Sequence, residues 1–239
     1  MSIMYNPMSV VTGLVLNIDA RNIRSWPGAG TTWYDVSGQT NTAYMYGSVP
    51  TSSDGGGCFD FSTVTGGGSG SASLGFTFAS NMIPTTGSFT LNCWVKNPPI
   101  SAGQCGLFSN AGGGDGYRFG IGADAIYYLV GPNYTEGGVG FTTALSSSSW
   151  YNVTAIYDRS GTNSAGTPQI QLYLNGVFQN TGYMPPSQTA MQNGVPGLVR
   201  SACCGLYTGK VSLFSAYSRA LAPIEVAQNF NALRGRYGV

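Results

Sequence analysis

Acidic side chains are the main candidates for chemistry in this sequence, because it contains no histidine. The absence of histidine excludes Ser-His-Asp and Cys-His catalysis and histidine metal ligands. Hydrolysis of a glycosidic bond needs two carboxyl groups about 5–5.5 Å apart for retention of configuration. The two glutamates are Glu136, in a glycine-rich segment, and Glu225, at the start of an expected helix, and no E-x-D-x-E pattern occurs. We therefore expect a protein without enzymatic activity.

The cysteines form neither a zinc pattern nor a disulfide framework. Their number is odd and no C-x-x-C pair is present. We expect buried, reduced thiols that act as small hydrophobic side chains. A Cys93–Cys105 bridge and a vicinal disulfide stay open on spacing alone. The five residues are Cys58, Cys93, Cys105, Cys203 and Cys204.

Composition narrows the class of protein further. Of the 239 residues 42% are hydrophobic, 13% aromatic and only 8% charged, and the net charge is +1. A weakly charged chain offers no electrostatic footprint for nucleic acid. No apolar run approaches the ~18–20 residues needed to span a bilayer, so we expect no membrane insertion. The first residues lack a basic region followed by an apolar run, so we expect no secretion signal and assembly in the cytoplasm.

Many short segments have the alternating pattern of β-strands, separated by clusters of Gly, Ser, Asn and Pro. Asn175-Gly176 lies between two of them and predicts a hairpin turn, since both central turn positions need positive φ. Phe89, Leu91 and Cys93 share one face of the segment 88–96. The expected strands are 14–18, 57–61, 88–96, 107–108, 117–121, 125–130, 150–158, 169–174, 177–178 and 210–217.

One helix is expected, at about 223–234. Pro223 suits the first helical position, and Glu225 suits the first turn. Gly235 can end the helix. Many short strands and one terminal helix predict an all-β fold, an antiparallel two-sheet β-sandwich or jelly roll with a short C-terminal helix. We expect an extended arm over 1–12 and a single domain over 13–239.

Four segments resemble one family when they are taken in order. Residues 33–41 read WYDVSGQTN, residues 88–96 read SFTLNCWVK, residues 150–158 with 172–176 read WYNVTAIYD and LYLNG, and residues 209–221 end in YSRAL. These motifs resemble LamG-like, concanavalin A-like jelly-roll domains over about residues 13–234. The resemblance implies a sandwich of two antiparallel sheets, and we assign Trp33, Trp94 and Trp150 to the fold and not to ligands.

The opening GLVLNIDA at 13–20 and the ending QNFNALRGRYG at 228–238 are similar to LamG-like proteins of tailed bacteriophages. That resemblance implies a non-enzymatic structural protein of the virion, a capsid decoration or cement protein. Its partners would be capsid or tail proteins and sister subunits. The residues expected to make these contacts are Tyr5, Met8, Arg234, Arg236 and Tyr237.

The alternative is a lectin-like, carbohydrate-binding module of a tail fibre or capsid surface that recognises host-surface polysaccharide. Exposed aromatic rings with polar neighbours would form such a site. Packing within the sandwich is the competing interpretation, because Tyr and Trp are common in strands. The candidate ligand-binding residues are Trp26, Tyr127, Tyr128, Tyr134 and Tyr207.

No cofactor is expected except calcium, which many LamG-like domains bind. Calcium takes six to eight oxygen ligands, and no D-x-[DN]-x-[DN]-G loop is present. For Asp35, an Asx-type turn with the following Ser37-Gly38 competes with metal binding. The candidate calcium ligands are Asp19, Asp35, Asp60 and Asp158.

Overall fold

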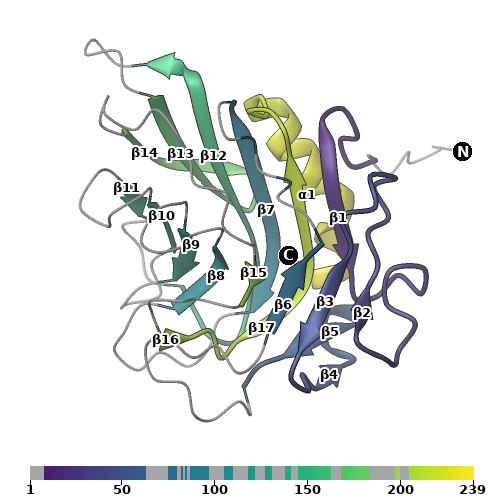
Figure 1. The fold of residues 1–239 in the computed structure, drawn as a ribbon. Helices are drawn as coiled ribbons and strands as arrows, with labels where there is room; N and C mark the ends of the chain where they lie inside the picture. Colours follow the sequence, from purple (N-terminus) through teal and green to yellow (C-terminus); the bar gives the residue numbers. More distant parts are fainter. Residues whose placement is uncertain are drawn as a thin grey trace, which may run out of the picture.

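Two β-sheets pack face to face in a computed structural model of the chain (Figure 1). The structure describes residues 8–62, 75–79, 82, 84, 87–96, 105–109, 118–121, 127–130, 138–140, 145–162, 168–183, 197–199 and 205–239. The expected antiparallel sandwich with one C-terminal helix is confirmed. Within the described residues, no helix is both long enough and apolar enough to cross a membrane.

The first sheet holds the strands with the clearest alternation. Its order is β14-β13-β12-β7-β17-β5-β4, with β1 also paired to β17, and all its pairs are antiparallel. Its strands are β1 (Leu14–Asp19), β4 (Thr51–Ser52), β5 (Cys58–Asp60), β7 (Phe89–Lys96), β12 (Trp150–Thr162), β13 (Pro168–Leu174), β14 (Val177–Tyr183) and β17 (Lys210–Tyr217).

The second sheet is built from shorter strands. Its order is β11-β10-β9-β8-β15-β6-β3-β2, and a further strand, β16, pairs with β8 in parallel. The strands are β2 (Thr32–Trp33), β3 (Ala43–Tyr46), β6 (Gly75–Phe78), β8 (Cys105–Ser109), β9 (Arg118–Ile121), β10 (Tyr127–Val130), β11 (Gly138–Gly140), β15 (Gly197–Leu198) and β16 (Gly205–Leu206). A short 3-10 helix, η1 (Asp54–Gly56), lies between β4 and β5.

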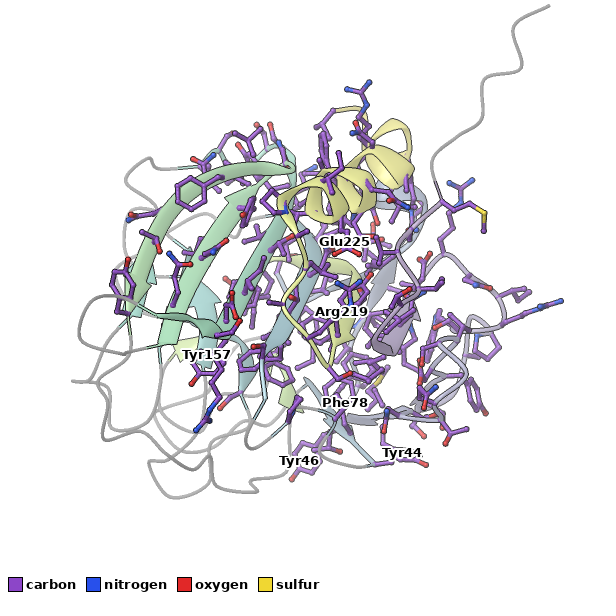
Figure 2. All side chains as sticks on the ribbon, turned by 90° about the horizontal axis from the view of Figure 1, so that it is seen from above. Tyr44, Tyr46, Phe78, Tyr157, Arg219 and Glu225 are labelled. Atoms are coloured by element: carbon purple, nitrogen blue, oxygen red, sulfur yellow. The ribbon has the colours of Figure 1, made fainter. Side chains whose placement is uncertain are left out.

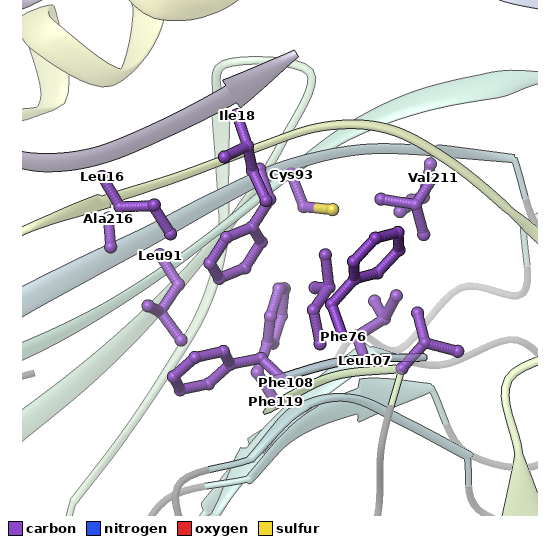
Figure 3. Close-up of a cluster of buried hydrophobic side chains, with 14 of the residues drawn as sticks. Leu16, Ile18, Phe76, Leu91, Cys93, Leu107, Phe108, Phe119, Val211 and Ala216 are labelled. Carbon is purple, nitrogen blue, oxygen red and sulfur yellow. The ribbon is translucent and has the colours of Figure 1, made fainter. Parts of the chain in front are cut away.

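The main core fills the space between the sheets (Figure 3). Phe89, Leu91 and Cys93 of β7 point into it, as their spacing predicts. Trp94, on the opposite face of β7, is also fully buried, although it belongs to a different apolar cluster. The central strand is therefore covered on both faces, and something must pack on the outer side of the first sheet.

The C-terminal helix α1 (Pro223–Tyr237) provides that cover. Its side chains Phe230 and Tyr237 stack on Trp94 at centroid distances of 5.8 and 4.0 Å. The expected end at Gly235 is wrong, because Gly235 lies inside the helix. Gly238 ends it instead with φ +72°, a left-handed conformation that glycine adopts without strain, and donates its N–H to the Arg234 carbonyl.

The N-terminal arm packs on the same outer face. Val10 is buried in a second cluster with Tyr217 and Val226. Its N–H donates to Asn229 Oδ1 (2.8 Å), and its carbonyl accepts from the Tyr217 hydroxyl (3.1 Å). Residues 8–12 are thereby tied to α1 and β17.

Two cysteines have described side chains, Cys58 and Cys93, and both are buried free thiols. The open possibility of a Cys93–Cys105 bridge is therefore wrong. Burial raises the pKa of the Cys58 thiol to about 11 and raises that of Cys93 as well, so both are protonated hydrophobic groups near neutral pH. Cys203 and Cys204 lie outside the described residues.

Candidate functional site

Two of the aromatic residues expected to bind a ligand belong to the core. Trp26 is buried and packs edge-on against Phe59 at 4.8 Å. Tyr207 is fully buried, and its hydroxyl donates to the Lys96 carbonyl (2.9 Å). The prediction is wrong for both, because the sandwich uses these rings to fill its interior. Tyr134 and the side chains of Tyr127 and Tyr128 lie outside the described residues.

The four candidate calcium ligands lie in four separate hydrogen-bonded settings. Asp35 accepts the N–H groups of Asn17 (2.8 Å), Ser37 (2.8 Å) and Asn41 (2.9 Å), which is the competing Asx-type turn. No group of three or more Asp, Glu, Cys or His within the described residues could hold a metal ion. The other three form these contacts: Asp19 with Arg236, Asp60 with Lys210 and Ser62, and Asp158 with Ser160 and Ser88.

Two of the residues expected to contact a partner are engaged inside the domain. The Arg236 guanidinium contacts both Asp19 carboxylate oxygens (2.7 and 2.8 Å) and donates to Ser212 Oγ (2.6 Å). Tyr237 is buried and donates to the same Ser212 hydroxyl (3.0 Å). The prediction is wrong for this pair, because both side chains hold α1 on the sheet. Met8 and Arg234 are exposed, and Tyr5 lies outside the described residues.

A cluster of charges lies where η1 meets the first sheet. Asp54 accepts from Lys96, Lys210 and the Trp150 indole N–H at 2.9–3.0 Å. Partial burial would raise the pKa of Asp54, but these donors outweigh that effect and hold it well below its ordinary value. Every strong charge in this cluster has an opposite partner, so it stabilises the fold and leaves no group free for a ligand.

A groove of about 610 Å³ opens on the outer face of the first sheet. One wall is the connection from β17 to α1, and the floor and other wall come from β12 and β13. Its volume falls within the range of sites that hold small molecules. The lining residues are Ser88, Ile156, Asp158, Ser160, Gln171, Ser218, Arg219, Ala220, Leu221, Ala222 and Pro223.

A row of polar side chains on β13 borders this groove. Tyr173 donates its hydroxyl to Gln171 Oε1 (2.8 Å), and Gln171 Nε2 donates to Gln169 Oε1 (2.7 Å). The row arises because alternate residues of a strand share a face, while Ile170 and Leu172 point into the core. Gln171 keeps a second amide hydrogen, so the row can hydrogen-bond a ligand in a fixed direction.

Exposed aromatic rings on β14 extend the same surface. Phe178 lies opposite Tyr173 and packs against it edge-on at 5.6 Å. Tyr183 lies opposite Gln169. Phe178 and Tyr183 are 50% and 39% exposed. Hydrogen-bonding amides next to exposed rings suit a ligand that has both apolar and hydroxyl-bearing faces.

The charged groups on the groove walls are satisfied within the protein. Arg219 makes two hydrogen bonds to Glu225, at 2.7 and 2.6 Å, and a third to the Thr12 carbonyl (2.9 Å) (Figure 2). The Arg219 hydrogen bonds lower the pKa of Glu225 and stabilise its carboxylate. Partial burial would raise the pKa of Asp158, but hydrogen bonds from Ser160 lead to a net lowering. Glu225 thus neutralises Arg219, whereas Asp158 keeps its negative charge, so the groove disfavours an anionic ligand.

Among the residues that line the groove, the sequence analysis named Asp158, as a candidate calcium ligand, but missed Gln171 and Arg219. The alternation of Gln169–Leu174 predicted a strand, and it also placed Gln169, Gln171 and Tyr173 together on the non-core face. That shared face was the available signal. The position of Arg219, by contrast, depends on how α1 docks.

Comparison with known proteins bears on the fold and the family. A search of curated proteins gave no match. The binding domain of paraclostridial mosquitocidal protein 1 is similar with a TM-score of 0.64 and 14% identity, over 92% of this chain and 52% of that chain. Botulinum neurotoxin type C, whose cell entry depends on interaction with two ganglioside molecules, is similar with a TM-score of 0.65 and 15% identity, over 92% of this chain and 51% of that chain. This chain thus spans about half the length of the toxin chains.

Domain 4 of AbnA, an extracellular arabinanase from Geobacillus stearothermophilus solved with arabinotriose, is similar over nearly its whole length. The TM-score is 0.64 and the identity 12%, over 90% of this chain and 97% of that domain. At these identities the likeness shows the fold alone. The family model described as the concanavalin A-like lectin/glucanases superfamily matches residues 66–227. The chain therefore belongs to the concanavalin A-like lectin/glucanases superfamily.

Proposed function

We propose that this chain is a non-enzymatic, lectin-like module that binds a neutral carbohydrate in the groove between β13 and the β17–α1 connection. The observation that carries the proposal is the hydrogen-bonded row of Gln169, Gln171 and Tyr173 beside a hollow in which Arg219 is already paired with Glu225. A sugar offers hydroxyl groups to such a row and its apolar ring face to the exposed aromatics of β14. Cell entry of botulinum neurotoxin type C depends on two ganglioside molecules, and domain 4 of AbnA was solved with arabinotriose. These two ligands support a sugar as the ligand class.

Two carboxylates at or near the groove support the proposed lack of catalysis. Asp158 lines the groove, while Glu225 is held by both terminal nitrogens of Arg219. A general acid needs a raised pKa, and the pKa of each of these two groups is lowered. Their environment suits structural carboxylates.

Calorimetric titration with neutral oligosaccharides, starting with arabinotriose, tests the binding proposal. Gln171→Ala should weaken binding about tenfold, because a hydrogen bond worth roughly 1–1.5 kcal/mol is lost. Gln39→Ala is the matched control, since Gln39 is exposed in another loop and does not line the groove. Equal affinities for wild type and Gln171→Ala would remove the groove from the binding site.

Attachment to a tailed-phage particle, as a capsid decoration or cement protein, is a second candidate. The arm favours it: Met8 and Val11 remain exposed although the arm is tied to α1, and they offer apolar contacts to a neighbouring protein. The copy number of the chain in purified particles, measured by quantitative mass spectrometry against the major capsid protein, tests this role. Hundreds of copies would support decoration, and absence from particles would rule it out.

A further inference from the structure

A second exposed aromatic surface lies on the outer side of the other sheet. In β3, Ala43 is buried and Met45 packs against the core, so Tyr44 and Tyr46 point outward, at 48% and 52% exposed. Residues two apart on a strand are about 6.7 Å apart along it. Figure 2 shows both tyrosines at the end of the molecule away from Arg219, while Phe78 lies inside. We call Tyr44 and Tyr46 the tyrosine platform.

Small and hydroxyl-bearing residues flank the platform. Thr32 of β2 and Thr77 of β6 lie directly opposite Tyr44, one on each side. Gly75 lies opposite Tyr46. Gly75 has φ +135°, and an added Cβ would lie 2.7 Å from the Leu198 carbonyl oxygen, so this position needs glycine. No side chain therefore projects from position 75 beside Tyr46, and a flat ligand can lie across the platform.

Charge is nearly absent from the segments that form this face. Residues 25–53 and 61–95 contain one charged side chain, Asp35. The Asp35 carboxylate already accepts hydrogen bonds from Asn17, Ser37 and Asn41. A surface of rings and hydroxyls without charge complements an uncharged, hydroxyl-rich chain rather than an acidic or basic partner.

We propose that the tyrosine platform is a second binding surface for neutral polysaccharide, on which sugar rings stack flat against Tyr44 and Tyr46. This inference rests on the proposed function and adds to it, because the platform and the groove lie on the outer faces of different sheets. One domain would then hold a polymer at two points. The platform contributes to retention on long chains, through effective concentration, while a short oligosaccharide occupies only the groove.

The test compares one short probe with one polymer. Arabinotriose is titrated in solution, and retention on immobilised linear arabinan is measured for wild type, the double variant Tyr44→Ala with Tyr46→Ala, and Gln171→Ala. If arabinotriose does not bind wild type, the corresponding pair of neutral glucan, mannan or xylan replaces it. We expect the double variant to bind the trisaccharide like wild type and to lose at least fivefold in retention on the polymer. Gln171→Ala should have a lower affinity for the trisaccharide and a lower retention on the polymer.

Matched controls remove exposed apolar side chains elsewhere. Ile23→Ala and Ile224→Ala, both at sites more than 70% exposed, should keep wild-type retention. Tyr44→Phe with Tyr46→Phe should keep most of it, because the rings remain. If the double alanine variant is retained like wild type, the proposed binding role of the platform is wrong, and the proposed role of the groove is unaffected. A loss confined to the double variant, with Gln171→Ala unchanged on both probes, would overturn the groove and support the platform.

Discussion

The groove and the tyrosine platform both present aromatic rings on the outer face of a sheet, yet they differ in depth. Beside the groove, α1 and its connection from β17 rise over the first sheet and supply a second wall. The platform has neighbouring strands on either side, and its flanking residues Thr32, Thr77 and Gly75 are small. A sheet alone gives a flat surface, and a hollow requires another layer packed upon it.

The layer beside the groove is held by contacts that a strand pattern does not reveal. Tyr237 stacks on Trp94, and Arg236 joins Asp19 to Ser212. The groove therefore combines this second layer with the hydrogen-bonding row on β13, whereas the platform offers exposed rings on a single sheet. We therefore expect the two regions to respond differently to the same kind of substitution.

The largest expected difference in the free energy of unfolding is between Tyr237→Ala and Tyr46→Ala. Removal of the buried Tyr237 ring leaves a cavity beneath α1 and should lower the free energy of unfolding by about 3 kcal/mol. Removal of the half-exposed Tyr46 ring should change it by less than about 0.5 kcal/mol. Urea unfolding followed by tryptophan fluorescence measures both. Similar losses in the two variants would show that the platform is as deeply integrated as the helix.

Gly75→Ala should destabilise the platform side by about 2 kcal/mol. The added methyl group meets the Leu198 carbonyl oxygen in a backbone conformation that L-residues rarely adopt. Gly30→Ala is the control, since Gly30 also has positive φ (+97°) but nothing lies within 4 Å of an added Cβ. The midpoint temperature of thermal unfolding of Gly75→Ala should be well below that of Gly30→Ala. Equal midpoint temperatures would mean that the close contact between position 75 and β15 does not affect stability.

Arg219→Gln should lower stability by about 1 kcal/mol at pH 7, because both partners of the pair are about a quarter to a third exposed. The pKa of Glu225 is lowered in the folded protein from an ordinary value of 4.5. A depressed carboxyl pKa stabilises the fold above the unfolded-state value, and this stabilisation is lost as pH falls through the folded value. The difference between wild type and variant should therefore shrink below pH 4.5. Urea midpoints between pH 7 and 3 measure it, and a difference that grew on acidification would contradict the assigned pair.

The smallest expected effect is that of salt on the affinity for the ligand. Because a neutral ligand carries no charge, Arg219 is already paired with Glu225 and the platform carries no charge, affinity for a neutral oligosaccharide should change less than about twofold between 50 and 500 mM NaCl. Calorimetric titration at the two concentrations measures this. A tenfold loss at high salt would point instead to an anionic ligand that contacts Arg219.

Local pattern was sufficient to predict the long strands and the turn between two of them. The strand at 210–217 was expected with the bounds it has, and Asn175 and Gly176 adopt the positive φ values (+49° and +75°) that their turn requires. The short strands β2 and β3 were missed, because two to four residues are too few to establish a period. The tyrosine pair of β3 was missed with them.

The sequence by itself determined the sandwich, its family and the scarcity of charge, because alternation and composition are local properties. Only the tertiary structure decided which aromatic and charged residues are available. Trp26 and Tyr207 lie in the interior, and Arg236 and Tyr237 lie under the helix. Alternation states which residues share a face of a strand, but it does not state what packs on that face. The docking of α1 on β7 and β17 answers that question for the first sheet, and its contact with β7 joins residues more than a hundred positions apart.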